Sequence, residues 1–167
     1  IDQAGNIRLD ATNTSMLGAK AWAAAKAGTV GVGASVATVV SNNQYKATLG
    51  DGAQVNANGL SLNAQNLKVS TPGVSLQVSG VDDIKNLPDR LTSGPLTGGT
   101  NYYTEAVSGA AGDNVSVAGA FAVNVFTDTT EAAIGNGAKV VTTGEVALTS
   151  LNDTGATSLA AAASLAG

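Results

Sequence analysis

The sequence predicts an all-β fold of the β-solenoid kind, in which short strands and turns coil upward by one strand-width per turn. Three observations support this prediction: the chain repeats itself, apolar residues recur at every second position, and most side chains are small. The 167 residues include 21 glycines but only one Trp, three Tyr and two Phe. An antiparallel sandwich, the alternative architecture, would favour two-residue hairpins and a broader core richer in aromatic residues.

Two internal repeats are visible. The longer one places Gly5 on Gly144, a shift of 139 residues, and then Asn13 on Asn152 and Ala21 on Ala160. The shorter one aligns residues 28–59 with residues 113–144 at a shift of 85. Because both keep order and phase without gaps, we expect the chain to be one period, with overlap, of a longer repetitive array.

Period-two alternation marks the first strands, at residues 30–40 and again at 115–125. In the second copy we expect an inner row formed by Val115, Val117, Gly119, Phe121, Val123 and Val125. The polar clusters at 41–43 and 127–130 predict turns that end both strands. Further short strands are expected at residues 7–11, 46–49, 54–57, 60–64, 74–78 and 146–150.

Two other segments need separate interpretation. The Ala-rich blocks at 19–27 and 159–166 have high helix propensity, but each ends within about ten residues, so we favour strand over helix. All three prolines fall between 72 and 95, and residues 81–91 have helical spacing. We therefore expect an excursion from the solenoid at about 80–103, with a short helix, a glycine-rich loop at 94–100, and a return near Tyr102 and Tyr103.

Composition excludes several kinds of chemistry. The absence of His and Cys removes Ser-His-Asp catalysis, the usual zinc ligands and disulfides, and charged residues are few. We expect no enzyme activity, no cofactor and no metal. The net charge of −4 argues against nucleic acid, and no apolar stretch approaches the roughly 20 residues of a membrane-spanning helix.

Candidate ligand sites are few. Gly50-Asp51-Gly52 and its repeat, Gly135-Asn136-Gly137, suggest calcium, but Asp becomes Asn in the second copy, so tight turns are the favoured interpretation. Asp82, Asp83 and Asp89 are typical of a solvated helix face. Trp22, Tyr102 and Tyr103 are possible ligand contacts, because aromatic rings stack on sugars. The alternative for Trp22 is a surface position at the edge of a turn, and the alternative for the two tyrosines is packing of the excursion against the solenoid.

The motif VGVGASVATVV, followed after a polar turn by ATLGDGAQVNANGLSLNAQN, resembles the repeats of large bacterial adhesins of the autotransporter and filamentous-haemagglutinin type. The second copy, VSVAGAFAVNVFTDTTEAAIGNGAKVVTTGEVALTS, resembles them too, and only about 72–105 departs from the pattern. The resemblance implies a right-handed parallel β-helix on a bacterial surface. It also implies turns of about 20 residues, so that one repeat would rise about 33 Å over about seven turns.

We therefore expect residues 1–167 to be a single β-solenoid segment, serving as a stiff stalk or fibre of a secreted, extracellular adhesin. Its partners would be neighbouring repeats of the same chain or stacked copies, and surface glycans or proteins. Two alternatives remain: a glycan- or protein-binding module that uses the 80–103 excursion, and a filament that assembles end to end.

Overall fold

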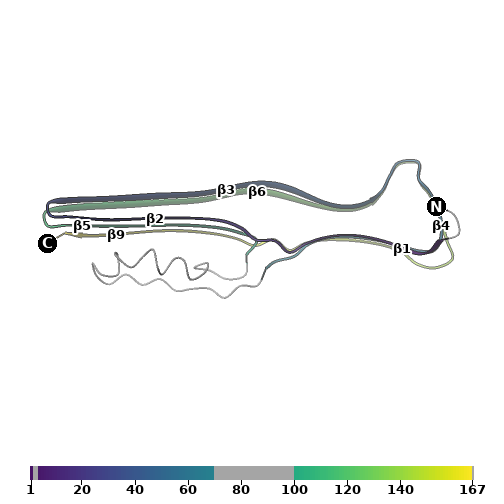
Figure 1. Ribbon diagram of the computed structural model, residues 1–167. Helices are drawn as coiled ribbons and strands as arrows, with labels where there is room; N and C mark the ends of the chain where they lie inside the picture. Colours follow the sequence, from purple (N-terminus) through teal and green to yellow (C-terminus); the bar gives the residue numbers. More distant parts are fainter. Residues whose placement is uncertain (2–3, 70–99, 167) are drawn as a thin grey trace. The chain divides into compact units, whose positions relative to one another are not determined.

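The computed structural model describes residue 1, residues 4–69 and residues 100–166, and every regular element in these ranges is a β-strand (Figure 1). The strands are β1 (Ala4–Asn13), β2 (Leu17–Ala27), β3 (Val30–Leu49), β4 (Gln54–Asn66), β5 (Tyr102–Gly112), β6 (Val115–Ile134), β7 (Lys139–Thr142), β8 (Val146–Asn152) and β9 (Ala156–Ala166). The all-β prediction is confirmed for these ranges. The strand expected at 74–78 and the helix expected at 81–91 lie outside them.

Strands that lie side by side come from distant parts of the sequence. β4 pairs in parallel with β1 on one side and with β7 and β8 on the other. β5 pairs in parallel with β2 and β9, and β3 pairs with β6 in a third sheet. Parallel strands require long connections, which explains why no hairpin joins any of these pairs.

The strand register accounts for the 139-residue repeat. Ile7 lies beside Leu60, and Leu60 lies beside Val146. Leu17, Tyr102 and Ala156 form an equivalent row in the other sheet. Positions 139 residues apart therefore lie two strands apart, or about 10 Å at the usual strand spacing.

The expected turn length is wrong. Side chains on adjacent strands are bonded across 53, 85 or 86 residues of chain. One 139-residue repeat therefore supplies two strands to a sheet, instead of the roughly seven turns and 33 Å rise that the resemblance implies. The 85-residue repeat relates strands that are direct neighbours, as in the pairing of Gln54 with Lys139.

The chain forms two compact units, each described here by itself. The first contains Ile1–Thr14, Asn42–Lys68 and Thr127–Thr154, and so holds β1, β4, β7, β8 and the C-terminal parts of β3 and β6. The second contains the described residues of Ser15–Ser41, Val69–Phe126 and Gly155–Gly167, and so holds β2, β5, β9 and the N-terminal parts of β3 and β6.

The core of the first unit is centred on β4. Leu60 and Leu62 have almost no exposed surface, and Ala47 and Ala64 complete the buried cluster. Since β4 has neighbours on both sides, its inward side chains are covered on every side, and each buried Leu contributes about 1.5–3 kcal/mol to stability. Partly buried side chains pack around this cluster, namely Ile7, Ala11, Leu49, Ala132, Ile134 and Val140.

The interior of the second unit is narrower and is lined by small residues. A Cβ added to Gly31 or Gly33 would overlap the backbone oxygens of Ala111 and Gly109, so β3 and β5 approach each other closely. Ser35 and Ala37 continue this buried row, while Val32 and its neighbours on alternate positions are exposed. Sheets usually stack about 10 Å apart, and only small side chains fit between backbones this close.

The expected inner row of β6 is therefore wrong. Val115, Val117 and Phe121 are about half exposed, and the half-buried positions are the small residues between them. The alternation was identified correctly, but its direction was reversed. Most of the large side chains of β3 and β6 in this unit point outward, because the narrow interior has little space for them.

The turns expected at 41–43 and 127–130 are also wrong, because β3 and β6 continue through both clusters. The Asn43 amide donates a hydrogen bond to the Asp128 carboxylate at 3.1 Å, so these polar side chains bond between neighbouring strands and do not turn their own backbone. The preference for strand in the two Ala-rich blocks is confirmed, since they form β2 and β9. Ala suits a strand here because it fits the narrow interior.

The two glycine-bounded turns are confirmed and lie one above the other. Gly52 and Gly137 have φ values of 66° and 67°, a conformation that favours glycine. The backbone N–H of Asn136 donates to Asp51 Oδ1 at 2.7 Å, and the N–H of Gly52 donates to the Asn136 carbonyl oxygen at 2.8 Å. Asp51 thus links the two turns.

Candidate functional site

The structure separates the three aromatic residues that the sequence suggested as ligand contacts. Tyr102 is 3% exposed, and its ring stacks on Phe126 with a centroid distance of 4.6 Å. Tyr103 follows it in β5 and so points to the opposite face of the sheet. Trp22 pairs with Val107, four positions beyond the row of Tyr103, or about 13 Å along the strand.

Tyr103 takes part in a packed charged cluster. Its ring lies over Gly18, where an added Cβ would overlap it, and the Lys20 amine lies 5.8 Å from the ring centroid. The same amine lies 3.6 Å from the carboxylate of Glu105, which is 1% exposed. The Lys20 amine therefore lies between the π-face of Tyr103 and the buried Glu105 carboxylate, and it links β2 to β5.

Trp22 is the exposed member of the three, with 51% of its surface accessible. Its indole lies on the same face of the β2–β5–β9 sheet as Lys20. An exposed indole offers an apolar surface for stacking. The ligand-binding hypothesis consequently depends on Trp22 more than on either tyrosine.

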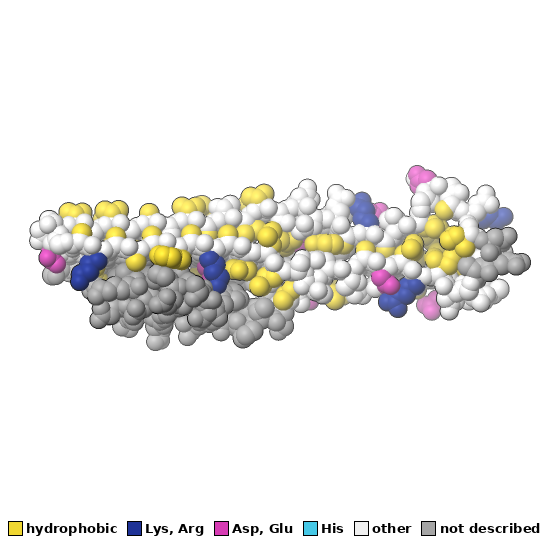
Figure 2. All heavy atoms as spheres, in the orientation of Figure 1, with side chains coloured by type: hydrophobic (Ala, Val, Ile, Leu, Met, Phe, Trp, Pro, Cys, Tyr) yellow, Lys and Arg dark blue, Asp and Glu magenta, His cyan; other side chains and the backbone are white. Residues whose placement is uncertain are grey.

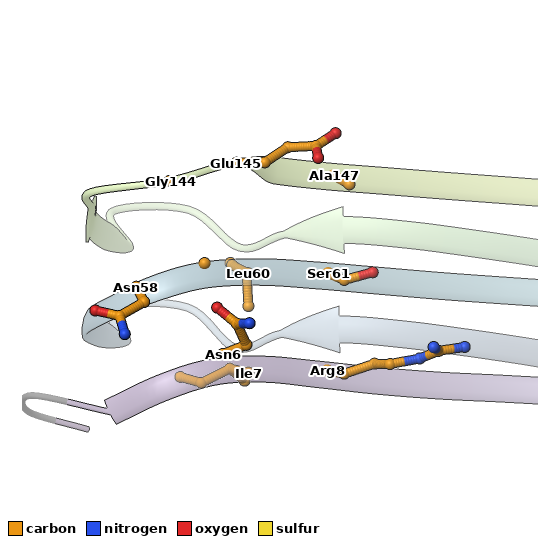
Figure 3. Close-up of a pocket in the computed structure, with 10 residues that line it drawn as sticks. Asn6, Ile7, Arg8, Asn58, Leu60, Ser61, Gly144, Glu145 and Ala147 are labelled. Carbon is orange, nitrogen blue, oxygen red and sulfur yellow. The ribbon is translucent and has the colours of Figure 1, made fainter.

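A groove of mixed polar and apolar lining lies on the first unit, where β1, β4 and the segment before β8 meet (Figure 3). It has a cavity volume of about 460 Å³ and is open to solvent. Side chains from three levels line it, among them Asn6, Arg8, Asn58, Ser61 and Glu145. These groups supply hydrogen-bond donors and acceptors, with one cation and one anion, and Ile7, Leu60 and Ala147 add apolar surface to the lining.

Two glycines form the narrow levels of this groove. A Cβ on Gly144 would lie 2.7 Å from the carbonyl oxygen of Asn58, and one on Gly59 would lie 3.1 Å from Asn6 Oδ1. Gly59 and Gly144 are the last identical pair of the 85-residue repeat. The groove therefore lies at equivalent positions of the repeat, where the backbones of neighbouring strands approach each other closely.

Beside the groove, Arg8 donates a hydrogen bond to Asp10 at 2.6 Å, and the Asn63 amide donates to the same carboxylate at 3.1 Å. These bonds favour the ionised form, so the hydrogen bond from Arg8, followed by that from Asn63, lowers the pKa of Asp10. The bond to Asp10 likewise raises the pKa of Arg8. All three side chains point outward, where solvent weakens the ion pair.

The most closely connected polar group is a ladder of stacked asparagines in the first unit. The Asn13 amide donates to Asn66 Oδ1 at 2.8 Å, and the Asn66 amide donates to Asn152 Oδ1 at 3.1 Å. Asn66 has no exposed surface, and its Nδ2 also lies 3.0 Å from Asp128 and 2.8 Å from Thr154. The ladder ties β1, β4 and β8 together at the ends of those strands.

Sequence reasoning matched Asn13 with Asn152 but missed Asn66 and Asp128. The signal was present, because IRLDATN, LSLNAQN and VALTSLN each end a strand with the same pattern. Each has large apolar residues at its first and third positions, a small residue at the fifth and Asn at the seventh. Unequal spacing, 53 and then 86 residues, hides this threefold repeat.

Among the described residues, no group of three or more Asp, Glu, His or Cys side chains is placed to hold a metal ion. In the same ranges, no helix has the length and apolar character needed to cross a bilayer. No family model matches the chain, and neither a curated protein nor a solved structure shows significant similarity to it.

Proposed function

We propose that this chain is a structural stalk or fibre segment of a secreted bacterial surface adhesin, folded as a right-handed parallel β-helix. Its role is reach and rigidity. The observation that carries the proposal is the Asn13–Asn66–Asn152 ladder, in which repeated positions stack with hydrogen bonds on neighbouring parallel strands. Side chains that bond to their own equivalents favour stacked repeats over a discrete globular domain.

The register supports continuation of the stack. β8 occupies the place of β1 in the next 139-residue repeat, and β9 occupies that of β2. A further repeat adds to their open edges by the same pairing that joins β1 to β4 and β2 to β5. Stability then grows with each added strand, because each strand contacts only its neighbours.

Tandem chains of one, two and four 139-residue repeats test the proposal. Electron microscopy is expected to show continuous stacks of constant cross-section whose height along the stacking direction increases by about 10 Å per repeat, two strand spacings. Separate globular beads on flexible connections would overturn the stalk. Antibody labelling of intact cells against permeabilised cells tests the surface location.

End-to-end assembly is a second candidate, and the edges of the sheets favour it. Within the described ranges, β1 and β8 pair only with β4, and β2 and β9 pair only with β5. Unpaired strand edges are templates for other chains. Fibres whose growth depends on protein concentration are expected if copies stack, and a strictly monomeric protein at high concentration would exclude this candidate.

A further inference from the structure

The outward face of β3 and β6 in the second unit is apolar to an unusual degree. Eight large side chains on it are between 47% and 73% exposed, and they are Val30, Val32, Val36, Val40, Val115, Val117, Phe121 and Val125. In Figure 2, hydrophobic side chains form a row along the upper edge, where Figure 1 draws β3 and β6. Residues 30–41 and 115–126 contain no charged residue at all.

This arrangement is the reverse of the usual one for a strand with one face exposed to solvent. A half-buried strand directs its large apolar residues inward and its polar ones to solvent, whereas here glycine, alanine and serine occupy most of the inward positions, and Val39 is the buried large residue of β3. Exposed edge strands normally carry charges that prevent association. A contiguous apolar patch without them marks an interaction surface.

The face is also shaped to fit itself. The 85-residue repeat places Val32 at the position of Val117 and Val36 at that of Phe121, so both strands carry the same sequence of large and small side chains. Gly119 precedes the projecting Phe121 by two positions on the same face, and the space above Gly119 is open. This open space leaves room for a Phe121 side chain from a second copy.

We propose that this β3–β6 face docks against the same face of a second copy of the chain, so that neighbouring stalks pair side by side as two stacked sheets. The contact is isologous, with each copy supplying the same residues. Sheets packed face to face interdigitate their side chains at a spacing of about 10 Å. The proposal rests on the stacked-repeat function above.

The area of the face predicts how this contact depends on length. Residues 30–40 on one strand and their neighbours on the other cover about 35 Å by 10 Å, or roughly 350 Å² per copy. Stable interfaces bury about 800 Å² per partner. One repeat therefore gives a weak and reversible contact, which oxidation of paired thiols can capture, and several stacked repeats, each adding two strands to the same face, give a lasting one.

A lipid bilayer is the other surface that an apolar sheet can contact. Interfacial membrane segments combine their apolar face with Lys, Arg and Trp at the boundary. The outward rows of residues 30–41 and 115–126 contain none of these. The observations therefore favour a second copy.

Cysteine cross-linking tests the contact, because the native chain has no Cys. Single variants Val32→Cys, Val36→Cys and Val40→Cys sample the face. Gln44→Cys is the matched control, since it is an exposed residue of the same outward row of β3 beyond the apolar patch. The fastest of the three is expected to form oxidised dimers at least about tenfold faster than the control, because docking raises the local thiol concentration.

Phe121→Lys in the Val36→Cys background supplies the counter-test. The added charge is expected to lower the rate to that of Gln44→Cys while circular dichroism and the melting temperature stay near those of the parent. Rates equal to the control in all three Cys variants, or rates that Phe121→Lys leaves unchanged, would overturn the proposal. So would protection of these thiols by phosphatidylcholine vesicles without any dimer.

Different results would contradict the stalk proposal and the docking of the β3–β6 face. If continuous stacks grow by about 10 Å per repeat but the thiols react no faster than the control, the stalk proposal stands and the lateral contact is excluded. Beads instead of continuous stacks would contradict the stalk proposal. Rapid dimer formation by the single chain would then indicate a simple dimer contact.

Discussion

Asn66 and Asn152 share a side-chain hydrogen bond of 3.1 Å although 86 residues of chain separate them. The bond lies where β4 and β8 end, and the same amide nitrogen approaches Asp128 on β6. A buried Asn that bonds to its own equivalents fixes the register of parallel strands, because a shift of one position would leave its amide unpaired.

Replacing Asn66 with Ala is expected to destabilise the fold by about 2–3 kcal/mol, because it removes the centre of a buried hydrogen-bond network. Urea unfolding followed by circular dichroism measures the change. Asn58→Ala, at an exposed position of the same strand, is the control and is expected to change stability by less than about 0.5 kcal/mol. Equal effects at the two positions would contradict a structural role for the ladder.

The close approach of β3 and β5 predicts opposite results for two glycines. Gly33→Ala places a methyl group on the backbone oxygen of Gly109 and is expected to cost about 1–3 kcal/mol through overpacking. Gly119→Ala, on the open face of β6, is expected to be neutral or stabilising by up to about 1 kcal/mol. The difference between their thermal midpoints checks this, and a Gly33→Ala protein as stable as the parent would show that the sheets are farther apart.

Lys20 holds the buried carboxylate of Glu105. Lys20→Met is expected to cost about 2 kcal/mol, because it leaves that carboxylate buried without its cation. Lys20→Met combined with Glu105→Gln removes both charges and is expected to recover most of the loss. Lys26→Met, on the same face of β2 but exposed, is the control. No recovery in the double variant would argue against the ion pair.

Acid is expected to weaken the first unit partly through Asp10. The hydrogen bonds from Arg8 and Asn63 lower the pKa of Asp10 in the folded chain below the value of about 3.9 found in unfolded peptides. Its contribution to stability is therefore complete above that value and is lost as pH falls through the folded pKa. A carbon-13 titration of the Asp10 carboxyl group measures the shift, and Arg8→Met should move the pKa upward. An Asp10 that titrates identically in both proteins would contradict the pairing.

Several features could be predicted from the sequence. The strands of residues 7–11, 54–57, 60–64 and 146–150 were found from alternation, and the two glycine turns from their Gly-x-Gly pattern. The strand state of the Ala-rich blocks followed from their short length. These features are local, so neighbouring residues specify them without reference to the rest of the chain.

The repeat was also visible, and its two shifts of 85 and 139 residues are the distances between strands one and two places apart. What the shifts could not reveal was how many strands one repeat supplies. Residues 69–100 lie within the connection between β4 and β5, so successive strands of a sheet are unequally spaced in the chain. A search for short, even periods therefore fails, and the pattern shared by Asn13, Asn66 and Asn152 is needed to find them.

The sequence by itself determined the all-β class of the described ranges, the alternation within the strands and the two glycine turns. Tertiary structure decided which side of each strand is the interior. Alternation shows that a strand has two faces, but it does not show which face points to the interior. In β3 and β6 of the second unit, the narrow interior takes mainly the small residues and leaves most of the large ones exposed. Gly31 and Gly33 face inward because β5 lies against them, and Val32 and Phe121 lie on the exposed outward face.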